Sequence, residues 1–192
     1  MRFMSSYLAL WFLAGFLTLV AIGLLRQVTV LKHSLEGFQR ESPLVIGSRA
    51  PKFSVVDMRS GRKITGEFLH GRITLILFIS PHCSICEHLV YSIDSLFGRY
   101  SFSLVAVCKG NEKECRRFTE PLSSEAVVLL DGDGEISEMY GVSNYPVAVV
   151  ADAERRVLSY SYPTDSKTLE EIVAVALRVG LNSTSQVVTD GA

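Results

Sequence analysis

A continuous apolar run that ends in two closely spaced cysteines constrains the fold more than any other part of the chain. Residues 73–79 read ITLILFI, which is typical of a strand buried on both faces of a sheet. Ser80-Pro81-His82 ends the run, and Cys83 and Cys86 follow, three positions apart. A helix beginning there places both sulfurs on one face, with the first at the positive end of the helix dipole. The junction predicts a redox-active pair in which Cys83 attacks as the thiolate and Cys86 resolves.

A structural zinc site is the alternative use of such a pair, and the sequence argues against it. Tetrahedral zinc needs four ligands, and the chain has no second pair at this spacing, so we predict no metal. The remaining cysteines are Cys108, expected to end a strand beside residues 73–79, and Cys115, expected on the following helix. They either form a second disulfide or remain two small buried thiols.

Two histidines flank the cysteine pair and could either stabilise a thiolate or help to bind a metal. His82, when protonated, would stabilise the Cys83 thiolate together with the helix dipole, although exposed histidines at a helix start often have no such role. Two thiolates and an imidazole also suit copper, so a copper metallochaperone using Cys83, Cys86 and His82 or His88 is one alternative. A non-catalytic docking protein is another.

Strand-like and helix-like patterns alternate between residues 44 and 181. This order predicts an α/β domain with one mixed sheet and helices on both faces. A proline, Pro146, opens a late strand, and we expect a cis peptide bond between Tyr145 and Pro146. We expect strands at 53–56, 63–65, 73–79, 104–107, 126–130, 147–150 and 156–160, and helices at 84–97, 111–119, 134–140 and 167–178.

Residues before this domain predict a membrane anchor. No charged residue lies between Tyr7 and Leu25, and a helix of that length spans a hydrocarbon layer of about 30 Å. A cleaved signal peptide is the alternative, but its apolar core is usually only about 7–15 residues long. We therefore assign residues 1–26 to an anchor, 27–43 to a helical stalk and 182–192 to a disordered tail.

Charge and cysteine content exclude two broad classes of protein. The formal net charge of −1 does not suit an electrostatic nucleic-acid binder, and four cysteines in 192 residues are too few for a disulfide scaffold. Basic residues are almost evenly divided between the two ends of the apolar run, so the orientation of the anchor has to come from other features.

Four segments carry a family resemblance: LRQVTVL at 25–31, GSRAPKF at 47–53, LILFISPHCSIC at 75–86 and GVSNYPVAVV at 141–150. With them the chain resembles the thioredoxin superfamily, in its membrane-anchored TlpA-like and redoxin branch, and most of all the MauD family of methylamine dehydrogenase accessory proteins. His82 and Ser84 stand where relatives often have tryptophan and proline.

The resemblance implies a thioredoxin-like fold and a single-pass inner-membrane protein with its C-terminal domain in the periplasm. It implies a thiol–disulfide oxidoreductase with no cofactor beyond the Cys83–Cys86 disulfide, acting as oxidase, reductase or isomerase. Pro146 would face the cysteines, and the backbone of Tyr145 would contact the client. The implied partners are a membrane redox protein and a client with cysteines, the small subunit of methylamine dehydrogenase.

Overall fold

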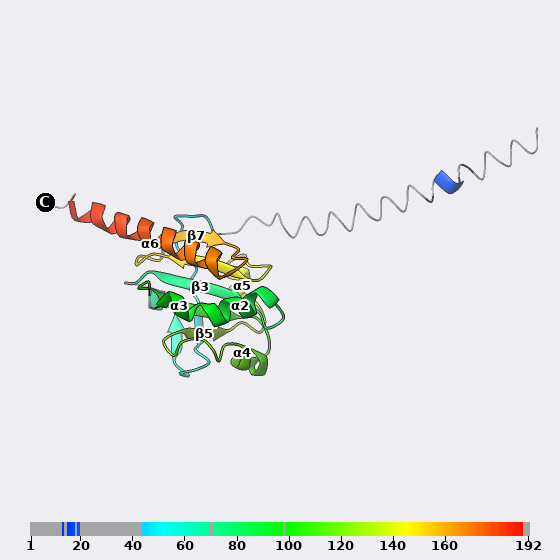
Figure 1. Cartoon of the computed structure of the whole chain (residues 1–192), viewed down its shortest axis with the longest axis horizontal. Coiled ribbons are helices and arrows are strands. Elements are labelled where there is room, and N and C mark those ends of the chain that lie inside the picture. Colours follow the sequence, from blue (N-terminus) through cyan, green and yellow to red (C-terminus); the bar gives the residue numbers. More distant parts are fainter. Residues whose placement is uncertain are drawn as a thin grey trace, which may run out of the picture. The chain divides into compact units, whose positions relative to one another are not determined.

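Strand β3 (Thr74–Ile79) is the centre of the fold, and every one of its residues is buried. The computed structural model describes residues 13, 15–17, 19, 44–69, 71–97 and 99–189. The main sheet has the order β5-β4-β3-β6-β7 (Figure 1). In it β4 (Ser103–Cys108) and β5 (Val127–Leu130) run parallel to β3, β6 (Val147–Ala151) runs antiparallel to β3, and β7 (Val157–Ser161) runs antiparallel to β6. The predicted mixed sheet is confirmed.

Helices occupy the segments where the sequence predicts them, with some differences at their ends. They are α2 (Ser84–Ser92), α3 (Asp94–Phe97), α4 (Glu112–Phe118), α5 (Glu135–Met139) and α6 (Ser166–Thr189). The start of α6 is fixed by Asp165, whose Oδ1 accepts a hydrogen bond of 2.7 Å from the backbone N–H of Thr168.

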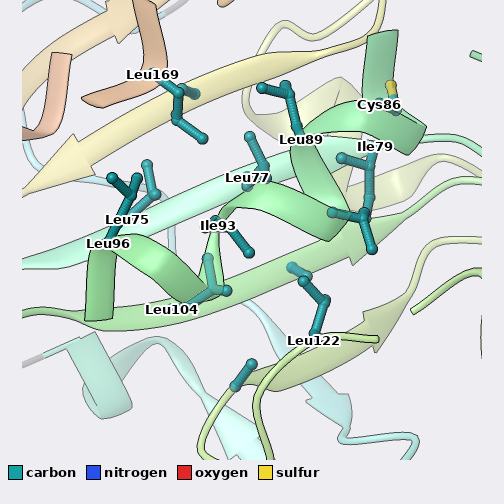
Figure 2. Packing of buried hydrophobic residues seen from close by; sticks show 14 of the residues in the cluster. Leu75, Leu77, Ile79, Cys86, Leu89, Ile93, Leu96, Leu104, Leu122 and Leu169 are labelled. Atoms are coloured by element: carbon teal, nitrogen blue, oxygen red, sulfur yellow. The ribbon is translucent and has the colours of Figure 1, made fainter. Parts of the chain in front are cut away.

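Side chains of alternate residues in β3 belong to two hydrophobic cores, one on each face of the sheet. Leu75, Leu77 and Ile79 point into the first core, where they meet Leu89 of α2 and Leu169 of α6 (Figure 2). Each of these five side chains is no more than 1% exposed. This packing holds α2 against the sheet, so the start of α2 is placed at the carboxyl end of β3.

The second core lies on the opposite face of the sheet. Ile76 and Phe78 point into it, and the ring centroid of Phe78 lies 5.2 Å from that of Tyr140. The Tyr140 hydroxyl donates a hydrogen bond of 3.1 Å to the carbonyl oxygen of Pro51. Burial raises the pKa of Tyr140 far above its usual range, so this donor remains protonated.

A short hairpin packs beside the main sheet. It consists of β1 (Ser54–Val56) and β2 (Lys63–Thr65), as predicted, and is followed by a 3-10 helix, η1 (Gly66–Leu69), that the sequence analysis did not predict. An isolated bridge between Asp57 and Leu129 joins the hairpin to β5.

Asp57 is the polar connection between the hairpin and the sheet. Its carboxylate accepts hydrogen bonds from the backbone N–H groups of Val128 (3.0 Å), Ser60 (3.1 Å) and Arg59 (3.2 Å), and from the Ser60 hydroxyl. Burial alone would raise the pKa of Asp57, but these donors hold it below its ordinary value of 3.8. The ionised carboxylate therefore contributes to stability.

Two helix ends differ from the prediction. The helix predicted at 84–97 is divided at Ile93 into α2 and α3, and the Ser92 hydroxyl donates to the carbonyl oxygen of Leu89 at this break. Serine side chains that bond to a preceding turn often bend helices. At the other end of the domain, α6 continues to Thr189, well past the predicted end near residue 178 and into the segment predicted to be disordered. Weak helix formers such as Ser and Thr lower helix stability by less than about 1 kcal/mol each, so without a proline the helix continues.

Most of the predicted anchor and all of the stalk at 27–43 lie outside the described residues. Within the anchor segment, residues 13, 15–17 and 19 are described and are helical. Leu13, Phe16, Leu17 and Leu19 are each 57–70% exposed. In the part of the chain that the structure describes, no helix is both long enough and apolar enough to cross a membrane.

Candidate redox site

Cys83 is the N-cap of α2, which is where the sequence places it. It has extended backbone angles (φ −114°, ψ 111°), and its Sγ accepts a hydrogen bond of 3.1 Å from the backbone N–H of Cys86. The two cysteines form a disulfide with their Cα atoms 5.2 Å apart. When the bond is opened, the same N–H and the helix dipole favour a thiolate at Cys83.

Exposure divides the roles between the two sulfurs. Cys83 is half-buried and so open to a partner, whereas Cys86 is 0% exposed and packs in the first core. An incoming disulfide or thiol can therefore reach Cys83 first, and Cys86 can act only on the sulfur beside it. This asymmetry is what the predicted roles of attacking and resolving cysteine require.

The loop before β6 lies across the cysteine pair. The Tyr145–Pro146 peptide bond is cis, which confirms the prediction for this bond. The carbonyl oxygen of Tyr145 lies 3.5 Å from Cys83 Sγ. The structure thus brings together four of the predicted site residues: Cys83, Cys86, Tyr145 and Pro146.

The side chain of Tyr145 has partners that the sequence analysis missed. Its hydroxyl lies 2.9 Å from Ser137 Oγ, and Ser137 Oγ donates to Asp131 Oδ2 at 2.6 Å. Burial raises the pKa of Tyr145, the hydrogen bond with Ser137 lowers it, and the charge of Asp131 raises it, with a net increase. The available signal was Asp131, four residues before the start of α5, whose carboxylate accepts hydrogen bonds from the backbone N–H groups of Ile136 and Ser137.

His82 lies beside the pair but has a partner on another helix. Its side chain is 77% exposed, and its Nε2 lies 3.6 Å from Oε2 of Glu114 in α4. His88 is also exposed. Stabilisation of the Cys83 thiolate by His82 stays a prediction. Among the residues that the structure describes, no three His, Cys, Asp or Glu side chains are grouped so as to hold a metal ion.

The other two cysteines are joined to each other. Cys108 pairs with Ile79 across the β3–β4 ladder, as expected, and forms a disulfide with Cys115 of α4, with a Cα–Cα distance of 5.9 Å. Both residues are 0% exposed. A disulfide shielded in this way is not accessible to a client, so its position favours a structural role over electron relay.

Gly110 lies between this second disulfide and the turn that precedes Cys83. A Cβ atom added at Gly110 would lie 3.3 Å from Cys115 Sγ and 3.4 Å from Cδ of Pro81. The absence of a side chain at Gly110 leaves room for both of these neighbours.

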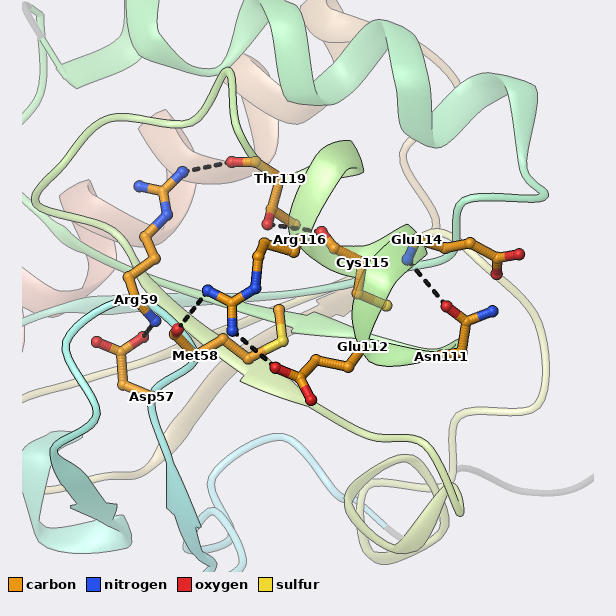
Figure 3. Close-up of polar contacts among 9 residues, drawn as sticks. All are labelled: Asp57, Met58, Arg59, Asn111, Glu112, Glu114, Cys115, Arg116 and Thr119. Atoms are coloured by element: carbon orange, nitrogen blue, oxygen red, sulfur yellow. Dashed lines mark hydrogen bonds and ion pairs between the residues drawn. The ribbon is translucent and has the colours of Figure 1, made fainter.

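Polar contacts also hold α4 in place (Figure 3). The Arg59 guanidinium donates to the carbonyl oxygens of Leu122 (3.0 Å), Ser123 (2.5 Å) and Thr119. Arg116 donates to the carbonyl oxygen of Met58 at 3.0 Å. These contacts and the disulfide hold α4 against the turn between β1 and β2 and against the end of β4.

An open groove of about 510 Å³ separates α2 from α4 and begins at Pro81, next to the redox pair. It has aromatic side chains and charges of both signs along its walls. The lining residues are Pro81, Glu87, Val90, Tyr91, Asn111, Lys113, Glu114, Arg117 and Phe118.

Comparisons with known proteins agree with this geometry. The chain is 28% identical to methylamine utilization protein MauD of Paracoccus denitrificans over 95% of this chain and 92% of that protein. It is 26% identical to thiol-disulfide oxidoreductase ResA of Bacillus cereus over 63% of this chain and 72% of that protein. The fold matches the crystal structure of a putative thiol:disulfide interchange protein DsbE from Chlorobium tepidum, with a TM-score of 0.62 and 23% identity over 70% of this chain and 99% of that one.

The resemblance found in the sequence is therefore confirmed, with a thioredoxin-like fold and MauD proteins among the relatives. The AhpC/TSA family matches residues 46–160, which is more than half of the chain. This protein belongs to the AhpC/TSA family.

Proposed function

We propose that this protein is a membrane-anchored thiol–disulfide oxidoreductase that exchanges disulfides with a protein client outside the cytosol. One observation carries the proposal. A half-buried Cys83 caps α2, bridges to a fully buried Cys86 and faces the carbonyl oxygen of a cis Tyr145–Pro146 bond. The ResA relative is a thiol-disulfide oxidoreductase by name, which supports the same activity.

The exchange needs only the two sulfurs and a client. In the reducing direction, the Cys83 thiolate attacks one sulfur of a client disulfide, forms a mixed disulfide and expels the other client sulfur as a thiolate. The Cys86 thiolate then attacks Cys83 Sγ, and the second client sulfur leaves. The client disulfide gains two electrons and the protein pair is left oxidised. The reverse sequence oxidises a client dithiol, and a membrane redox partner returns the pair to its starting state.

A location on the outer side of the inner membrane fits the cysteine chemistry. Both cysteine pairs are bonded, and structural disulfides persist in oxidising compartments such as the periplasm. The uncharged run from Tyr7 to Leu25 supports a single-pass anchor ahead of a periplasmic domain. Alkaline phosphatase fused to the C-terminus tests this topology, because the fusion is active only on the periplasmic side.

The similarity to MauD proteins supports a narrow client range. We propose that the client is the small subunit of methylamine dehydrogenase, whose disulfides must form during its maturation. The groove between α2 and α4 includes Pro81, two residues before Cys83, and offers a concave surface for a client segment bound at Cys83.

A trap for mixed disulfides tests the proposal directly. Cys86→Ser leaves Cys83 able to attack a client but removes the sulfur that releases it. We expect the full-length variant, expressed in cells, to carry client proteins that dithiothreitol releases. The matched control is Cys83→Ser/Cys86→Ser.

Two results would contradict the proposal. One is capture by Cys86→Ser no greater than in the control. The other is full maturation of the client in cells that contain only the double-serine protein, which would favour a non-catalytic docking protein.

A further inference from the structure

A directed chain of hydrogen bonds runs from Tyr145 into the protein. Asp131 is 3% exposed and accepts hydrogen bonds from the backbone N–H groups of Ile136 (3.0 Å) and Ser137 (2.9 Å) at the start of α5. Both carboxylate oxygens of Asp131 therefore act as hydrogen-bond acceptors, Oδ1 for Ile136 and Oδ2 for Ser137. Ser137 has a single hydroxyl proton, and it points to Asp131 across 2.6 Å.

The proton between Tyr145 and Ser137 therefore belongs to Tyr145. Because the Ser137 hydroxyl already donates to Asp131, it can only accept from the Tyr145 hydroxyl, 2.9 Å away. The tyrosine ring also packs against both hydrophobic cores. The side chain of Tyr145 is thus fixed at its ring and at its hydroxyl.

This fixed side chain belongs to the residue whose carbonyl oxygen lies against Cys83. We propose that Tyr145, held by Ser137 and Asp131, is a positioning residue that keeps its own carbonyl oxygen 3.5 Å from Cys83 Sγ. The proposal rests on the proposed function, because it concerns the reactivity of the attacking sulfur. It gives Tyr145 a side-chain role in addition to the backbone contact with a client.

The carbonyl oxygen and the helix act on Cys83 in opposite directions. A carbonyl oxygen accepts a hydrogen bond from a thiol and is unfavourable beside a thiolate, so it opposes ionisation. The Cys86 N–H and the start of α2 favour ionisation. When the hydrogen bond between the Tyr145 hydroxyl and Ser137 is lost, the loop before β6 becomes free to move. The carbonyl oxygen of Tyr145 then moves away from Cys83, and the pKa of Cys83 falls.

Other charged groups around the pair stay unchanged in the experiment. His82 and its partner Glu114 of α4 lie on one side, Glu87 is exposed in the first turn of α2, and Asp131 lies behind Tyr145. Variants that alter only the phenol or the serine hydroxyl leave all four of these side chains in place. A change in the acidity of Cys83 then reports the position of the loop.

The test measures the pKa of Cys83 in the full-length Cys86→Ser protein, from the pH dependence of its alkylation by iodoacetamide. Adding Tyr145→Phe removes the anchoring hydroxyl and keeps the ring. Ser137→Ala removes the acceptor by a separate route. Each is expected to lower the pKa of Cys83 by about 0.5 to 1, the value of one modest hydrogen bond. Tyr100→Phe is the control, since its hydroxyl contacts Glu170 of α6 instead.

The outcomes separate this proposal from the proposed function. An unchanged Cys83 pKa in both variants would overturn the positioning role, and a lower melting temperature with an unchanged pKa would leave Tyr145 a purely structural residue. The measurement uses no client and no exchange reaction. Failure of the wild-type protein to exchange disulfides would therefore contradict the proposed function without changing this result.

Discussion

The buried disulfide gives the most quantitative prediction. Replacing Cys108 and Cys115 together by alanine removes a cross-link between residues seven positions apart. Closing a loop of this size lowers the entropy of the unfolded chain by an amount worth about 2.5 kcal/mol at 25 °C. Both residues are 0% exposed, so the lost sulfur contacts add to this value. For a chain of this length the melting temperature should fall by about 5–10 °C.

Redox chemistry at the first pair should survive this change. Helix α4 keeps the contact of Arg59 with Thr119, the C-cap of the helix, and that of Arg116 with Met58. Cys83 and Cys86 are placed by β3 and α2, which the second disulfide does not join. We therefore expect dithiothreitol to reduce the Cys83–Cys86 bond of the double-alanine variant at a rate within about twofold of wild type.

Thermal unfolding of the full-length protein, followed by circular dichroism, measures the first effect. Mildly reduced wild type, in which only the Cys83–Cys86 bond is open, is the control for redox state. A variant that melts at the wild-type temperature would refute the reasoning, because the bond would then contribute nothing to stability.

Three further predictions concern residues that stabilise the fold around the site. Asp57→Asn should lower the free energy of unfolding by about 1–3 kcal/mol at neutral pH, because buried donors lose a charged acceptor. Since folding lowers the pKa of Asp57, its contribution is complete above its ordinary pKa of 3.8 and is lost as pH falls through the lower value, so urea unfolding of the variant should depend less on pH below about 4. Leu77→Ala, in the centre of the first core, should cost about 2–5 kcal/mol in the same urea assay; a smaller loss would contradict the packing described. Gly110→Ala should cost about 1–3 kcal/mol, seen as a lower melting temperature, because its methyl group would contact both Pro81 and Cys115; an unchanged melting temperature would contradict that close approach.

Features that depend on a local pattern could be predicted from the sequence. An uninterrupted apolar run predicts β3 because only a strand covered on both faces buries every side chain. A second apolar run predicts a neighbouring strand that ends at Cys108, which the structure confirms for β4. The cis bond before Pro146 follows from a proline at the entrance to a strand.

Features that depend on contacts between distant segments could not be predicted. Hydrogen bonds between hydroxyl and carboxylate side chains leave no periodic pattern in a sequence. No pattern in the sequence therefore indicated that Tyr145 would bond to Ser137, or Ser137 to Asp131. The pairing of His82 with Glu114 has the same origin, since it depends on how α4 packs beside α2. Only the folded chain shows these partners.

The central claim is that Cys83 is the accessible, reactive sulfur of a reversible disulfide. Partial reduction in a dithiothreitol buffer, followed by alkylation and mapping of the labelled cysteines by mass, tests it most directly. The account predicts that the Cys83–Cys86 bond opens first and that Cys83 takes up label before Cys86, while Cys108 and Cys115 stay bonded. Labelling of Cys108 and Cys115 first, or an inert Cys83 in reduced protein, would contradict it.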